Sequence, residues 1–81
     1  MNRVPVVLPE LGTNRCQFSL WFVRIGEAVR EGDRLAEVNF PGAVVDIAAP
    51  ADGVLVERTA LAEDEISTGQ LLGTIETPAE S

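Results

Sequence analysis

The sequence contains no lysine, no histidine and no tyrosine, and all six of its basic residues are arginine. The absence of lysine removes every side-chain amine from these 81 residues. Without histidine, and with Cys16 as the only thiol, few ligands remain for a transition metal, so we expect no metal site. No nucleophile–base pair or phosphate-binding loop is recognisable either, so we expect no catalytic residues and no enzymatic activity.

Disulfides, long apolar runs and positive charge are also lacking. Cys16 has no partner for an intramolecular disulfide, which favours a reducing, cytoplasmic location. No apolar run approaches the roughly 20 residues of a membrane span, and Pro5 and Pro9 interrupt the start of the chain, so no signal peptide is visible. The formal net charge of −7 repels phosphate backbones and anionic headgroups. We therefore expect no nucleic-acid or membrane partner; the acidity fits a basic protein partner or serves solubility alone.

The residues that are present indicate a β-protein. Only four residues are aromatic, so valine, isoleucine and leucine must supply the core, a bias that favours sheet over helix. Glycine and proline recur every few residues and separate short apolar runs of strand length. The runs are 4–8, 17–25, 34–40, 43–48, 54–59 and 70–77. The pattern predicts one small all-β domain, a sandwich or barrel.

An internal repeat supports this prediction. A shift of 37 positions places Val29 on Ile66, Gly32 on Gly69, Leu35 on Leu72, Val38 on Ile75, Phe18 on Leu55 and Cys16 on Gly53. Each half is too small to hold a core of its own, whereas two halves bury their apolar faces against each other around a pseudo-twofold axis. We therefore expect the repeated apolar residues to be buried as symmetry-related pairs.

Five segments stand in an order and spacing typical of a known family. They are Leu-Pro-Glu-Leu-Gly at 8–12, Trp-Phe at 21–22, the glycine-containing stretch 23–33, Pro-Ala-Asp-Gly at 50–53, and a second glycine turn at 65–70. Together they resemble the lipoyl/biotinyl carrier domains, most closely the lipoyl domains of 2-oxo acid dehydrogenase acyltransferases. The resemblance covers nearly the whole chain and implies a flattened β-barrel of two sheets with pseudo-twofold symmetry, a barrel-sandwich hybrid. We take residues 1–77 as the domain and 78–81 as a disordered tail or the start of a linker.

The resemblance implies a cofactor site that this sequence cannot complete. In the family a tight hairpin presents Asp-Lys-Ala or Met-Lys-Met, and the lysine amine forms an amide with lipoate or biotin. Counting along the chain places that hairpin at residues 40–43, where Gly42 replaces the lysine, flanked by Pro41 and Ala43. We therefore expect no bound cofactor. Pro41 and Gly42 at the two central positions favour a type II turn.

Three functions remain open. The first is a protein-interaction or assembly module that keeps the fold without a swinging arm. The second is a degenerate or regulatory paralogue of a carrier within a 2-oxo acid dehydrogenase or carboxylase-type complex. The third, a membrane-adaptor subunit, usually has a helical hairpin between its half-motifs, and here the halves are contiguous. Phe40, Pro41 and Gly42 are the candidate protein contact: Phe40 either stays partly exposed and anchors a partner, or folds back over the loop.

Overall fold

The computed structural model describes residues 2–12 and 15–78, and these residues form eight β-strands and no helix. The strands are β1 (Asn2–Val7), β2 (Cys16–Trp21), β3 (Ala28–Val29), β4 (Arg34–Phe40), β5 (Ala43–Ala48), β6 (Gly53–Arg58), β7 (Glu65–Ile66) and β8 (Leu71–Thr77). Of the expected tail at 78–81, only Pro78 lies within the described residues. The domain boundary at residue 77 stays a prediction.

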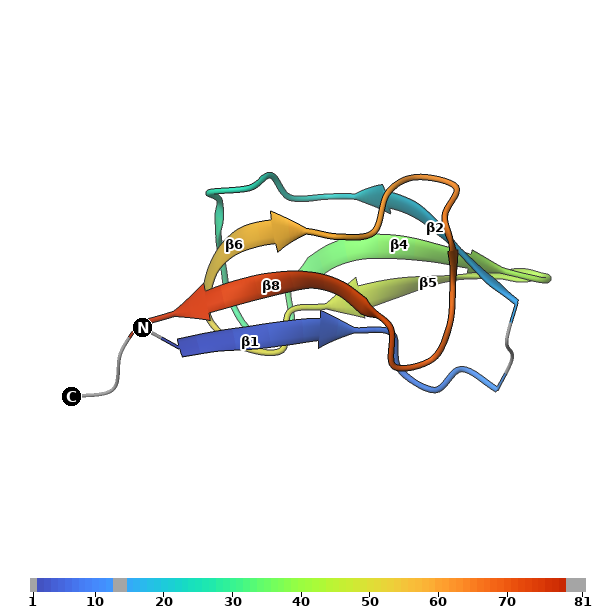
Figure 1. Ribbon diagram of the computed structural model, residues 1–81, viewed down its shortest axis with the longest axis horizontal. Helices are drawn as coiled ribbons and strands as arrows, with labels where there is room; N and C mark the ends of the chain where they lie inside the picture. The colour runs from blue at the N-terminus through green and yellow to red at the C-terminus, as the bar shows by residue number, and fades with distance from the viewer. Residues whose placement is uncertain (1, 13–14, 79–81) are drawn as a thin grey trace.

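The strands build two four-stranded antiparallel sheets that face each other (Figure 1). Sheet A has the order β1-β8-β6-β3, and sheet B has the order β5-β4-β2-β7. The chain crosses repeatedly between the layers, so each half of the sequence supplies strands to both sheets. β1 begins and β8 ends at one end of the molecule, and the β4–β5 hairpin projects at the opposite end (Figure 1). The predicted all-β fold of two sheets is confirmed.

The repeat of 37 residues is realised strand for strand. β2, β3 and β4 coincide with β6, β7 and β8 after this shift, and both halves have a register irregularity at the same place, after Phe18 and after Leu55. The connecting hydrogen bonds repeat too: the amide of Phe22 donates to Leu35 O, and that of Thr59 to Leu72 O, both at 2.8 Å. The sequence repeat is therefore a repeat of backbone conformation, as a pseudo-twofold axis requires.

The apolar repeat positions meet in the centre of the molecule. Phe18, Leu35, Val38, Leu55, Leu72 and Ile75 are each fully buried and belong to one continuous core. The predicted burial of Leu35, Leu72, Val38 and Ile75 as symmetry-related pairs is confirmed.

Trp21 packs against this core from its edge. Its ring lies 5.2 Å from that of Phe18, and its indole N–H donates to Ala60 O at 2.9 Å. A Cβ on Gly73 would come within 2.8 Å of the indole, so glycine there makes room for the ring. Trp21 is thus half-buried against the core, whereas Arg58, its repeat equivalent, is exposed.

Two features of the strand pattern differ from the predicted runs. The run 17–25 is too long, because β2 ends at Trp21 and the chain turns, with the amide of Glu27 donating to Arg24 O. The two-residue strands β3 and β7 were not predicted, since two residues are too few for a period-2 pattern to be visible. The runs at 34–40 and 43–48 match β4 and β5.

A pair of equivalent turns differs in one residue. Gly26 and Glu63 correspond after the shift of 37, and their amides donate to Leu55 O and Phe18 O. Both have positive φ, +94° for Gly26 and +72° for Glu63. A left-handed conformation is costly for a residue with a Cβ, whereas glycine adopts it freely. The second half therefore contains backbone strain that the first half avoids.

We predict that Leu35→Ala and Leu72→Ala each lower the free energy of unfolding by about 2–5 kcal/mol, because each removes a fully buried side chain from the shared core. Urea unfolding measures both values. Leu20→Ala, at an exposed position of β2, is the control and should cost far less. An unchanged unfolding midpoint for either core variant would contradict the assignment of the core.

We also predict that Glu63→Gly raises the free energy of unfolding by about 0.5–1 kcal/mol, because relief of the left-handed strain outweighs the extra entropy of glycine in the unfolded chain. The matched variant Gly26→Ala should lower it by about 1 kcal/mol or more. A Cβ at Gly26 meets no atom within 4 Å, so this loss reports backbone conformation alone. Thermal unfolding measures both variants; destabilisation by Glu63→Gly would refute the strain.

Candidate functional site

The residues expected at the attachment hairpin form a tight turn between β4 and β5. Phe40 and Ala43 are paired across the two strands, so Pro41 and Gly42 alone make the loop. The φ of Gly42 is +82°, and the proline ring restricts the φ of Pro41 to about −65°. This combination defines the type II turn that the Pro-Gly sequence favours.

The turn presents no nucleophile. Pro41, Gly42 and Ala43 are exposed and lack reactive side chains, and a Cβ on Gly42 would meet no atom within 4 Å. The position thus has room for a side chain that the sequence does not supply. β1 begins at Asn2, which pairs with Thr77 at the end of β8. This end of sheet A lies opposite the hairpin (Figure 1).

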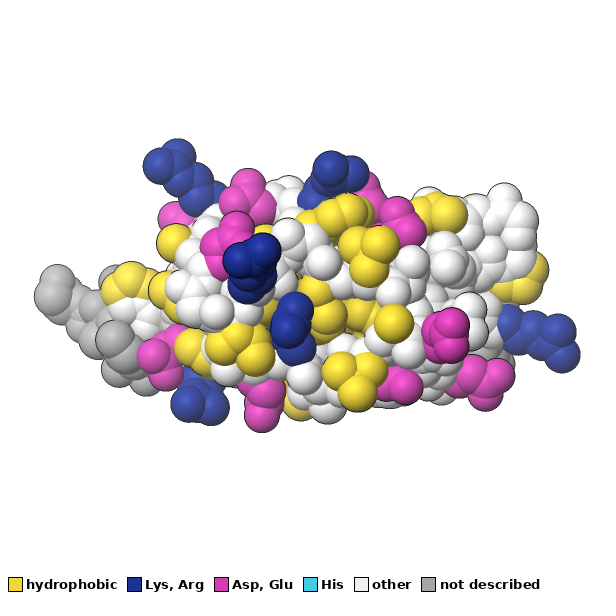
Figure 2. Space-filling view, turned by 90° about the horizontal axis from the view of Figure 1, so that it is seen from above, with side chains coloured by type: hydrophobic (Ala, Val, Ile, Leu, Met, Phe, Trp, Pro, Cys, Tyr) yellow, Lys and Arg dark blue, Asp and Glu magenta, His cyan; other side chains and the backbone are white. Residues whose placement is uncertain are grey.

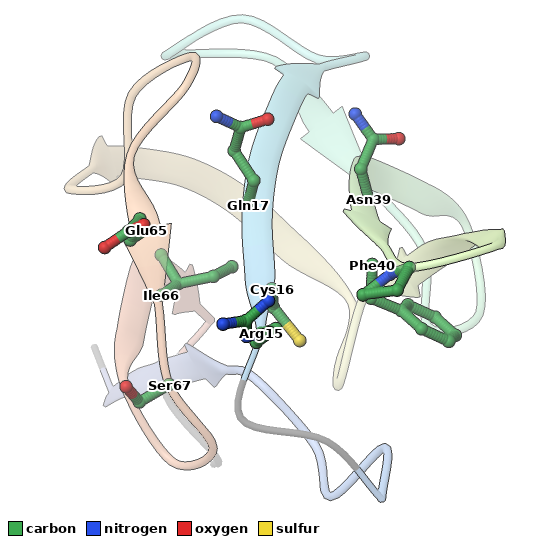
Figure 3. A pocket seen from close by; sticks show the side chains of 9 residues that line it. Arg15, Cys16, Gln17, Asn39, Phe40, Glu65, Ile66 and Ser67 are labelled. Carbon is green, nitrogen blue, oxygen red and sulfur yellow. The ribbon is translucent and has the colours of Figure 1, made fainter.

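A pocket of about 660 Å³ opens beside the hairpin. Cys16 and Gln17, at the start of β2, lie at its centre, between β4 on one side and β7 on the other (Figure 3). Asn39, Phe40 and Pro41 line the first side, and Glu65, Ile66 and Ser67 line the second, while Arg15 completes the lining. The lining combines polar side chains at the mouth with the buried side chains of Cys16 and Ile66.

One residue of the lining differs clearly from its repeat equivalent. Gly53, the equivalent of Cys16, lies so close to β8 that a Cβ there would meet Glu76 O and come within 2.7 Å of Ile75 Cγ2. Cys16, by contrast, has a side chain at the equivalent place, and this buried side chain lines the pocket. The alignment of Cys16 with Gly53 did not predict a pocket, because the packing of strands against one another is not visible in a sequence.

Phe40 has two environments at once. Its half-buried ring packs against the core and also lines the pocket, so it partly covers the base of the hairpin and is partly accessible. The partial exposure that the first alternative requires is present, and the ring also packs on the core. A contact with another protein through Phe40, Pro41 and Gly42 stays a prediction.

Charges of both signs are interspersed on one face of the molecule. Arginines and acidic side chains alternate over the face in Figure 2, with hydrophobic side chains along its middle. Among residues 2–12 and 15–78, no three histidine, cysteine, aspartate or glutamate side chains are grouped to hold a metal ion. Within the same residues, no helix is long and apolar enough to cross a membrane. The hairpin and its pocket are therefore the candidate functional site.

Two antiparallel sheets related by a pseudo-twofold axis, with a two-residue hairpin at one end, define a carrier-type barrel-sandwich hybrid. Residues 4–75 match the family described as biotin-requiring enzyme, the biotin/lipoyl attachment domains, and the chain belongs to this family. The predicted resemblance is confirmed.

Two relatives indicate which branch of the family the chain resembles. The chain is 26% identical over 77 residues to the dihydrolipoyllysine-residue succinyltransferase component of the 2-oxoglutarate dehydrogenase complex of Buchnera aphidicola. That match covers 93% of this chain and 20% of the relative, so the chain spans about a fifth of the relative's length. The lipoyl domain of the 2-oxoglutarate dehydrogenase complex of Azotobacter vinelandii superposes with a TM-score of 0.68 and 26% identity, over 89% of this chain and 90% of that domain. The similarity is thus to a lipoyl domain.

We predict that Phe40→Ala lowers the free energy of unfolding by about 1–3 kcal/mol, less than the roughly 3–5 kcal/mol of a fully buried phenylalanine, because the ring is half-buried. Phe40→Leu retains apolar packing and should cost under about 1.5 kcal/mol. Chemical denaturation compares the two. Equal stability of wild type and Phe40→Ala would show that the ring does not pack on the core.

Proposed function

We propose that this chain is a non-enzymatic member of the family that is neither lipoylated nor biotinylated and that acts as a protein-interaction or assembly module. One observation carries the proposal: the hairpin tip expected to present the modified lysine has Gly42 instead, and none of the 81 residues is a lysine. Attachment of either cofactor needs an amine that forms an amide. Neither a shift in register nor a neighbouring residue provides a substitute.

The architecture supports a retained binding role. Pro41 stiffens the exposed tip, which limits the entropy lost when the tip is ordered by a partner. Phe40 supplies an aromatic side chain at the base of the same turn, and aromatic residues often dominate binding energy at protein interfaces. We propose that Phe40, Pro41 and Gly42 form part of the contact with a protein partner. A cytoplasmic location is proposed on the unpaired Cys16 alone.

A second candidate function is a degenerate or regulatory paralogue of a carrier, acting inside an acyl-transfer complex without carrying a group. Both relatives favour it, since each belongs to a 2-oxoglutarate dehydrogenase complex. The two candidates differ in partner. Co-purification with dehydrogenase or acyltransferase subunits supports the second, and its absence in cells that contain such a complex supports the first.

We predict that the chain retains its unmodified mass when it is co-expressed with lipoate and biotin ligases and both cofactors, because it has no lysine amine to acylate. Intact-mass spectrometry measures this. The A. vinelandii lipoyl domain, expressed in parallel, reports whether lipoylation operates in the same cells. A mass increase equal to a lipoyl or biotinyl amide on the wild-type chain would overturn the proposal.

The double variant Pro41→Asp/Gly42→Lys is the matched control, because it places a lysine at the tip of the same fold. Removing proline frees the turn to leave the type II geometry, in which lysine at a φ of +82° would be strained. We expect this variant to gain the mass of a lipoyl group, because it restores Asp-Lys-Ala at the tip. Modification of the variant alone would assign the loss of the carrier role to these two residues.

A further inference from the structure

The two sheets expose two long edges, and these edges are equivalent. A shift of 41 positions carries β1 onto β5, with Val4 pairing to Ile75 as Val45 pairs to Val38. The edges do not close on each other, since no Cα of β1 lies within 8 Å of a Cα of β5. The other edge strands, β3 and β7, have only two residues each. Among the described strands, β1 and β5 are thus the edges long enough to pair with another strand.

The backbone of β5 presents hydrogen-bonding groups to the open side. In an antiparallel pair, hydrogen-bonded and non-hydrogen-bonded positions alternate. Phe40 and Ala43 flank a two-residue turn and form a hydrogen-bonded pair, so Val44 and Asp46 lie at non-hydrogen-bonded positions. Their N–H and C=O groups therefore point away from β4. Val44 is also 59% exposed, the largest value for a big hydrophobic side chain within any described strand.

The same positions on β1 are blocked. Pro5 is the equivalent of Asp46 and has no N–H, and Arg3 is the equivalent of Val44. Proline and charge on an edge strand prevent pairing with further strands. β5 contains no proline and no basic residue, and its outward side chains are Val44, Asp46 and Ala48. One of two symmetric edges is therefore protected and the other is open.

The charges around Asp46 define which strand fits. Asp46 lies directly opposite Glu37, and like charges at such positions are unfavourable. Arg34 approaches Asp46 at 3.5 Å with both side chains exposed, while Glu37 accepts a hydrogen bond from the hydroxyl of Ser19 at 3.1 Å. The face thus holds two carboxylates and one nearby guanidinium. A strand added along β5 places a side chain beside Asp46 on this face, and a cationic one satisfies the excess negative charge.

We propose that the edge of β5 binds an extended, basic segment of a partner protein by β-strand addition, with a lysine or arginine beside Asp46 and apolar side chains beside Val44 and Ala48. The proposal rests on the proposed function of the chain as an interaction module and names its partner's chemistry. Backbone hydrogen bonds to Val44 and Asp46 supply the pairing, and the carboxylate of Asp46 selects the positive charge. The net charge of −7 attracts such a segment from a distance.

The test uses the synthetic peptide acetyl-Val-Thr-Arg-Thr-Val-amide as the probe, titrated up to millimolar concentration into the isotope-labelled 81-residue chain and followed through backbone amide NMR shifts. We expect the largest shifts in β5 and none in β1. A peptide with glutamate in place of arginine should bind at least fivefold more weakly. A peptide with N-methylated backbone amides should bind at least tenfold more weakly, because it cannot donate to the edge.

Asp46→Pro is the decisive variant, since it gives β5 the residue that β1 has at the equivalent position. At a non-hydrogen-bonded position the proline removes an N–H that β4 does not use, so the fold is retained, as Pro5 shows for β1. We expect peptide affinity to fall at least tenfold. Asp46→Ala keeps the N–H and loses the charge, so it should weaken binding less and abolish the preference for arginine over glutamate. Pro5→Ala is the control and should leave binding at β5 unchanged.

NMR shifts that are confined to β5 and are lost in Asp46→Pro support the proposal. Equal affinity of the wild-type chain for all three peptides overturns it, and so does equal affinity of the wild type and Asp46→Pro for the arginine peptide. Concentration-dependent dimerisation that Asp46→Pro abolishes, measured by sedimentation, also overturns it, because the occupant is then a second copy. Should Asp46→Pro unfold, the N-methylated peptide takes its place: binding as tight as that of the unmethylated peptide overturns strand addition. The intact mass of the same sample tells the two failures apart. A lipoyl or biotinyl mass increase refutes the proposed function, whereas loss of peptide binding without a mass increase refutes strand addition.

Discussion

The mutual burial of two half-motifs is the constraint on which the rest of this structure depends. Leu35 and Val38 from the first half and Leu72 and Ile75 from the second are fully buried in one core. Each buried aliphatic side chain contributes about 1.5–3 kcal/mol, and a domain of this size has only about 5–15 kcal/mol of net stability. The few buried side chains of one half do not offset the conformational entropy that its residues lose on folding, about 1–2 kcal/mol for each residue. Because each half supplies strands to both sheets, the core forms only when both halves are in place.

The departures from symmetry are more informative about function than the symmetry itself. Cys16, the equivalent of Gly53, lines a pocket at one end of sheet B. Asp46 leaves the β5 edge of sheet B open, whereas its equivalent Pro5 blocks the β1 edge of sheet A. The hairpin joins the pocket and the open edge, since β4 lines the pocket and β5 forms the edge.

Family membership and activity are separate matters in this chain. The fold of a carrier domain is retained over residues 4–75, and the hairpin retains its two-residue loop. Carrier chemistry depends on one amine at the tip, whereas the fold depends on apolar residues that lie elsewhere. A glycine in place of lysine at the tip is therefore compatible with the fold, and the binding role that we propose for the hairpin does not depend on the carrier chemistry.

The all-β class, the repeat and the buried pairs could all be predicted from the order of the residues. These features are local or periodic: a shift of 37 residues aligns Leu35 with Leu72, and a Pro-Gly pair is enough to predict the type II turn at Gly42. β3 and β7 escaped prediction because they are too short to show a pattern. The half-burial of Phe40, the pocket at Cys16 and the open edge at Asp46 became visible in the folded chain alone. Each of these depends on which strands are neighbours and how closely they approach, and that is set by long-range pairing between residues far apart in the chain.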